Sequence, residues 1–128
     1  VGFASSLRAR LSDTFSSEIG KGFGKRTFLI TTLKPVLPGT EGAISIEGSI
    51  AGLLGSFIMT VFMLNLSIIS GLSVAFIVFL SGYLATFLES YIGAVVQNKI
   101  NWMTNELVNS IQTSIAAIIS IFLYLNFV

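Results

Sequence analysis

Three long stretches of the chain are almost free of charged residues. They cover about residues 49–69, 72–96 and 106–128, and each is close to the roughly 20 residues that a helix needs to cross a bilayer. Residues 2–19 also have a helical pattern, but two arginines and two acidic residues make this segment a poor membrane span on its own. The pattern predicts an all-α fold, a polytopic transmembrane helix bundle with three spans and one polar N-terminal helix.

The connections between these segments differ in polarity. Residues 20–47 form a long polar loop that contains both prolines and four of the seven basic residues, whereas residues 70–71 are a short uncharged turn. Residues 97–105 are short and polar and include Lys99. Counting the crossings places the long loop and residues 97–105 on the same side of the membrane. The positive-inside rule makes this side cytoplasmic, or stromal in a plastid.

The composition agrees with a membrane location and excludes several kinds of chemistry. Of the 128 residues, 53% are hydrophobic and 10% are charged, whereas a soluble domain has about 25% charged residues. The net charge of +1 argues against a nucleic-acid partner. The sequence has no Cys and no His, which excludes disulfides, zinc sites built from these residues and a histidine base. Acid–base or metal chemistry would have to use Asp, Glu, Lys or hydroxyl groups.

Three acidic residues stand out by their positions in the helical segments. Asp13 and Glu18 are about 140° apart around the N-terminal helix, and ion pairs with Arg8 or Arg10 would also explain them. Glu89 lies inside an apolar span, where an ionisable side chain is costly and is usually functional or paired. A position near the membrane interface is the alternative interpretation of Glu89.

Glycines dominate the segment that follows the N-terminal helix. They would let backbone N–H groups approach an anion, and Lys25 would then neutralise phosphate charge. A flexible helix exit is the alternative. The glycines are Gly20, Gly22 and Gly24.

A second dense segment, residues 38–52, contains two carboxylates and several more glycines. Glu41 and Glu47 are suitable oxygen ligands for Mg²⁺, although Glu47 is equally well placed as a first-turn carboxylate of the next helix. Gly52 and Gly55 are predicted to be packing glycines, because small residues let membrane helices approach closely. Further on, Asn105 and Asn109 share one helical face, and Asn105 could instead cap its helix.

Four stretches, in this order, resemble the motifs of a known family. They are SDTFSSEIGKGFGK at 12–25, LPGTEGAISIEGSIAGLLGS at 37–56, ESYIGA at 89–94 and NELVN at 105–109. The set resembles the plastid phytyl-phosphate kinases of vitamin E synthesis and their uncharacterised integral membrane relatives, and is distantly similar to CTP-dependent phytol and dolichol kinases. The resemblance implies a membrane enzyme that makes a prenyl (phytyl) diphosphate from the monophosphate, with Mg²⁺ and CTP as co-substrate.

The resemblance also implies a set of site residues. The expected catalytic residues are Asp13, Glu18, Glu47 and Glu89. The expected nucleotide-binding residues are Ser17, Lys25, Gly39, Thr40, Glu41, Gly42, Gly48, Asn105 and Asn109. Mg²⁺ is expected on Asp13 and Glu47, and the lipid chain of the substrate is expected between the helices.

The family domain is usually about twice this long, so the chain is expected to be the C-terminal half of a larger domain. The implied location is a plastid membrane, envelope or thylakoid, with the polar face on the stromal side, or the cytoplasmic face in a bacterium. The implied partners are membrane lipids, an isoprenoid lipid phosphate and other membrane subunits that cover the open side of the bundle.

Two other functions remain open at this point. The first is a shortened, non-catalytic family member that serves as a structural or accessory subunit of a larger, for example photosynthetic, membrane complex. The second is a channel or transporter, which is suggested by Glu89 and the glycine-interrupted segments alone.

Overall fold

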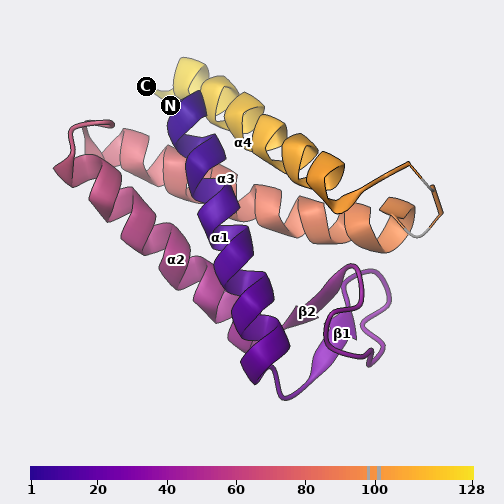
Figure 1. The fold of residues 1–128 in the computed structure, drawn as a ribbon. Helices are drawn as coiled ribbons and strands as arrows, with labels where there is room; N and C mark the ends of the chain where they lie inside the picture. The colour runs from indigo at the N-terminus through magenta and orange to yellow at the C-terminus, as the bar shows by residue number, and fades with distance from the viewer. Residues whose placement is uncertain (98, 101) are drawn as a thin grey trace.

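The computed structural model describes residues 1–97, 99–100 and 102–128, and it confirms the helical membrane fold (Figure 1). Its helices are α1 (Gly2–Phe23), α2 (Ile46–Asn65), α3 (Leu72–Ile92) and α4 (Asn105–Phe127), and a π-helical turn, Gly93–Gln97, continues α3. Within the described part of the chain, α2, α3 with its extension, and α4 are long and apolar enough to cross a membrane. The helix α1 is the polar fourth helix.

Two helix boundaries differ from the sequence prediction. The helix α1 continues past residue 19, because the glycines there do not interrupt it and the N–H of Gly24 still bonds to the carbonyl of Gly20 at 3.1 Å. The helix α2 begins at Ile46 rather than near residue 49. Its N-cap is Ser45, whose Oγ accepts a hydrogen bond from the Gly48 N–H at 3.0 Å.

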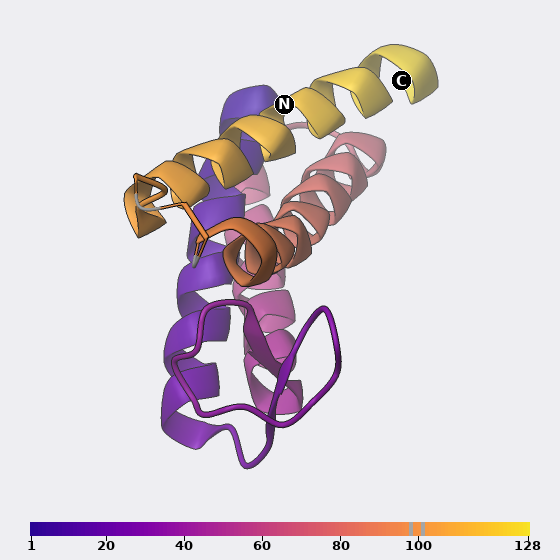
Figure 2. The same cartoon turned by 90° about the vertical axis from the view of Figure 1, so that its right-hand side faces the viewer.

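The polar loop between α1 and α2 is partly ordered as a small sheet. The strands β1 (Thr27–Leu29) and β2 (Ala43–Ser45) pair in antiparallel fashion. Strands of three residues are too short to show an alternating pattern in the sequence, so they were not predicted. The sheet lies beside the C-terminal end of α1 and the start of α2 (Figure 2).

The helix α1 is the centre of the bundle, since it contacts α2, α3 and α4. Three glycines of α2 allow its close contact with α1. A Cβ added to Gly48 would lie 2.6 Å from the carbonyl oxygen of Ser16, and one added to Gly52 would lie 3.0 Å from the Ser16 Cβ. A Cβ on Gly55 would lie 3.1 Å from the ring of Phe15. The prediction that Gly52 and Gly55 are packing glycines is confirmed.

Arg8, the one fully buried charged residue of α1, connects this helix to α2 and α3 by hydrogen bonds. Arg8 is fully buried, and it donates hydrogen bonds to the carbonyl of Val78 on α3 at 2.7 Å and of Ser56 on α2 at 3.3 Å. Its guanidinium also lies 4.7 Å from the ring centroid of Phe79. An ion pair between Arg8 and the acidic residues of α1 is therefore not formed, because Arg8 points into the bundle.

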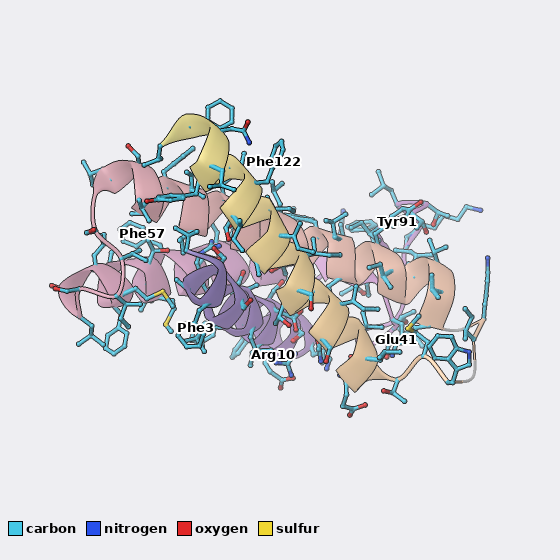
Figure 3. The ribbon with its side chains drawn as sticks, turned by 90° about the horizontal axis from the view of Figure 1, so that it is seen from above. Phe3, Arg10, Glu41, Phe57, Tyr91 and Phe122 are labelled. Carbon is cyan, nitrogen blue, oxygen red and sulfur yellow. The ribbon has the colours of Figure 1, made fainter. Side chains whose placement is uncertain are left out.

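The polar and apolar parts of the chain lie at different ends of the bundle. The N-terminus, the end of α4 and the turn between α2 and α3 lie together at the upper left of Figure 1, and the sheet lies at the lower right. Figure 3 shows Phe122 pointing away from the bundle, whereas Glu41 lies beside the end of α3. The exposed aromatic and aliphatic side chains of α2 and α4, such as Phe57 and Phe122, suit contact with lipid.

Candidate functional site

A polar cavity of about 420 Å³ lies at the end of the bundle that carries the sheet. Its walls are the second half of α1, the segment that leads into β2 and the α2 cap, the end of α3 and the start of α4. All but three of the expected site residues line it. These lining residues are Asp13, Ser17, Glu18, Gly39, Thr40, Glu41, Gly42, Glu89, Asn105 and Asn109.

The three expected residues outside the cavity are Lys25, Glu47 and Gly48. Lys25 is exposed, and its backbone N–H donates to the carboxylate of Glu47 at 3.4 Å. Glu47 lies in the first turn of α2. This position agrees with the alternative interpretation of Glu47 as a first-turn carboxylate. Gly48 is buried where α2 touches α1, so its role is close helix contact. The structure does not unite Asp13 and Glu47 in one cavity, as the expected Mg²⁺ site would require.

One face of α1 forms a charged wall of the cavity. Arg10 pairs with Asp13 at 3.4 Å, and Lys21 pairs with Glu18 at 3.5 Å. The hydroxyl of Ser17 donates to the backbone carbonyl of Asp13 at 2.8 Å. The pairing of Arg10 with Asp13 is the alternative that the sequence left open for Asp13, whereas Lys21 was not expected here. The spacing of these two basic residues, three or four positions from Asp13, Ser17 and Glu18, places them on the same helical face, and this signal could have identified them.

Carboxyl groups from α1, from the loop before β2 and from α3 line the cavity, namely those of Asp13, Glu41 and Glu89. Asp13 and Glu89 are close enough for each carboxyl group to affect the ionisation of the other, and Glu41 adds negative charge near Glu89. Burial raises the pKa of Asp13 above its ordinary value, and the Arg10 guanidinium opposes this shift. Among the described residues, Glu41 and Glu89 have no ion-pair partner. This arrangement favours the binding of a cation.

The start of α4 contributes amide groups to the cavity. The N-cap of this helix is Thr104, whose Oγ1 accepts a hydrogen bond from the Leu107 N–H at 3.3 Å. Asn105 is therefore not the N-cap of α4. Asn109 is buried, and its Oδ1 has no hydrogen-bond partner among the described residues. A buried amide oxygen of this kind is normally paired, so a ligand in the cavity would supply the missing donor or cation.

The donor set of the cavity fits Mg²⁺, a hard cation that binds oxygen ligands. Within the described ranges, no group of three acidic side chains is close enough to hold a metal ion by itself. Mg²⁺ is usually held by one or two carboxylates together with substrate phosphates. The Asp13–Glu89 pair, with a phosphate as the further ligand, has this composition.

The polar cavity sits in a segment that matches a family of membrane proteins. The family described as integral membrane protein DUF92 matches residues 1–117. The chain belongs to this family. DUF92 proteins therefore share the segment from α1 to α4 that forms the cavity walls.

Three curated relatives cover nearly all of the chain. An uncharacterized membrane protein of Synechocystis is 48% identical over 121 residues, which are 94% of this chain and 46% of the relative. Protein VTE6, chloroplastic, of Arabidopsis thaliana is 45% identical over 123 residues, 94% of this chain and 37% of that protein. An uncharacterized membrane protein of Methanocaldococcus jannaschii is 36% identical over 124 residues, 97% of this chain and 51% of the relative.

The chain thus spans about a third to a half of the length of these curated relatives. No solved structure matches it.

Proposed function

We propose that this chain carries the catalytic cavity of a membrane-embedded prenyl (phytyl) phosphate kinase, which makes a prenyl diphosphate from a nucleoside triphosphate. The observation that carries the proposal is the convergence of four acidic and two basic side chains in one cavity at the polar end of a membrane bundle. The four motifs that resemble phytyl-phosphate kinases supply most of its walls. The Arabidopsis relative is named as a chloroplastic protein, which is compatible with a plastid enzyme.

The charges of the cavity are suited to phosphoryl transfer, which depends mainly on positioning and on electrostatic stabilisation. Arg10 and Lys21 would turn from their pairing with Asp13 and Glu18 toward the phosphates of the nucleotide. Asp13 and Glu89 would hold Mg²⁺, so that Glu89 replaces Glu47 as the second metal ligand. Bound there, Mg²⁺ would neutralise charge on the nucleotide phosphates.

The acceptor explains why a histidine base is not needed. A phosphate monoester loses its second proton near pH 6, so the attacking oxygen of a prenyl phosphate is already ionised at neutral pH. The protein then has to hold two anionic groups in line and to exclude water, and it does not have to remove a proton. The side-chain amide N–H groups of Asn109 can donate to phosphate oxygens for this purpose, and the Ser17 hydroxyl would do so after turning from the Asp13 carbonyl.

The proposal predicts turnover that depends on Asp13. We expect the purified chain in lipid nanodiscs to convert phytyl phosphate to phytyl diphosphate with Mg²⁺ and CTP or ATP. Asp13→Asn should lower the rate by about a hundredfold or more, because it removes a metal ligand whose charge has to be present in the transition state. Product formation is measured by thin-layer chromatography with γ-labelled nucleotide. The kinase proposal fails if the parent chain neither binds nucleotide nor forms product, and an accessory role would then be favoured.

We further propose that the polar end faces the stroma in a plastid, or the cytoplasm in a bacterium, because the basic loop residues lie there. The absence of native cysteine allows a simple measurement. Lys34→Cys, at an exposed position of the polar loop, should react with a membrane-impermeant maleimide only when the stromal or cytoplasmic side is opened. Labelling from the opposite side of sealed vesicles would contradict this orientation.

A further inference from the structure

An apolar groove of about 240 Å³ lies next to the polar cavity. It is bounded by Phe28 and Ile44 of the sheet, by Leu53 of α2 and by Tyr83 of α3. The groove and the cavity share two wall residues, Ile44 and Ser45. The two spaces therefore meet at β2, so that one molecule with a polar and an apolar part could occupy both.

Along α3 the groove lies farther from the polar end of the bundle than the cavity does. On α3 the cavity is lined by Glu89 and the groove by Tyr83, six residues earlier, which corresponds to about 9 Å along the helix. On α2 the groove extends from Ile46 down to Leu53, away from the capped end of the helix. A ligand that occupied both spaces would thus have its polar group near Glu89 and its apolar part near Tyr83 and Leu53.

Aromatic side chains continue the direction of the groove along α3. The rings of Tyr83 and Phe87 meet edge to face at 5.0 Å between centroids, and those of Phe79 and Tyr83 are stacked at 6.4 Å. All three rings are half-buried. Such a row offers flat apolar surface to an extended chain with methyl branches and double bonds.

We propose that this groove holds the first isoprenoid units of a single-chain lipid phosphate whose phosphate lies in the polar cavity. This inference rests on the proposed kinase function, and it adds the place of the lipid chain. A groove of about 240 Å³ is smaller than the roughly 300–1,000 Å³ typical of a site for a drug-sized ligand. It therefore suits part of one chain, and the two chains of a phospholipid would not fit side by side.

The test measures binding without nucleotide, so it does not depend on turnover. The probes are dimethylallyl, geranyl and phytyl phosphate, which carry the same head on chains of increasing length. Leu53→Trp fills the groove, and Ile58→Trp is the matched control, because Ile58 lies on the same helix, is 58% exposed and lines neither space. Ser49→Phe is a second groove-filling variant, in case Leu53→Trp does not fold.

We expect the parent chain and Ile58→Trp to bind phytyl phosphate at least about tenfold more tightly than dimethylallyl phosphate, because more apolar surface is buried. In Leu53→Trp and Ser49→Phe this preference should disappear, while the affinity for dimethylallyl phosphate stays the same. The groove assignment is overturned if the groove-filling variants keep the parent's preference for long chains. It is also overturned if dipalmitoyl phosphatidic acid competes as well as phytyl phosphate does.

The outcomes separate this inference from the proposed function. Binding that depends on chain length and on Leu53, without any turnover, would support the groove and contradict the kinase. Turnover without dependence on chain length would support the kinase and contradict the groove.

Discussion

Glu89→Gln is expected to raise the melting temperature of the metal-free protein and, at the same time, to abolish its stabilisation by Mg²⁺ with CTP. The first effect follows from the proximity of the Glu89 carboxyl to those of Asp13 and Glu41. Two carboxylates about 4 Å apart repel each other by about 1 kcal/mol even in water, and by more in a partly buried site. Removing one of these charges should therefore stabilise the folded state at pH 8.

The second effect follows from the assignment of Glu89 as a metal ligand. A ligand at 100 times its Kd stabilises the state that binds it by about 2.7 kcal/mol. This gain should be seen in the parent chain and should be lost in Glu89→Gln. Thermal unfolding in detergent, with EDTA or with Mg²⁺ and CTP, measures both effects on the same samples.

Glu106→Gln is the matched control for Glu89→Gln. Glu106 is exposed in the first turn of α4 and is not among the residues that line the cavity. It should leave the response to Mg²⁺ and CTP unchanged. If Glu89→Gln responds to Mg²⁺ and CTP as the parent does, Glu89 does not take part in binding the metal.

Gly42→Ala should damage both the fold of the polar loop and the binding of nucleotide. Gly42 has a φ of +76°, and an added Cβ would lie 2.3 Å from the Cβ of Ala94 and 2.7 Å from the carbonyl oxygen of Ser90. The left-handed conformation costs about 1–2 kcal/mol for a residue with a side chain, and overpacking adds about 1–3 kcal/mol. The loop would have to move away from the end of α3, which would separate Glu41 from Glu89.

Gly39→Ala separates the effect of the left-handed backbone conformation from the effect of the contact with α3. Gly39 lies in the same loop with a φ of +87°, but a Cβ there would meet nothing within 4 Å. It should have the conformational effect alone and a smaller loss of nucleotide affinity than Gly42→Ala. Equal effects of the two substitutions on unfolding and on binding would show that the contact with α3 is unimportant.

The arrangement of the spans could be predicted because membrane helices are governed by one simple requirement, the burial of about 20 apolar residues. Counting crossings placed the long loop with Glu41 and the segment 97–105 on one side of the membrane, whereas the inclusion of Glu89 and Asn105 in the site came from the resemblance to a family. The same reasoning could not place Glu47, because a carboxylate in the first turn of a helix and a metal ligand next to that helix look identical in the sequence. In the structure α2 begins at Ile46, so Glu47 lies in the first turn of this helix and accepts from the Lys25 backbone N–H.

The burial of Arg8 could not be predicted either. Its two bonded carbonyls belong to Ser56 and Val78, which are far away in the sequence, and the space for its guanidinium depends on Gly82, where a Cβ would lie 2.3 Å from Nη1. These are tertiary contacts between three helices. A local pattern on α1 shows only an arginine near two acidic residues, so an ion pair was the natural expectation.

The close contact of α2 with α1 restricts which substitutions α2 can tolerate. None of the described residues between Ile46 and Asn65 lines the polar cavity, so α2 contributes to that cavity by supporting the helix that carries Asp13. Tolerance to substitution along α2 should therefore rise and fall with a helical period. It should be lowest at Gly48, Gly52 and Gly55, where almost any side chain would push α1 and its charged face out of register. At exposed positions that line neither the cavity nor the groove, such as Leu54 and Ile58, one apolar residue should serve as well as another.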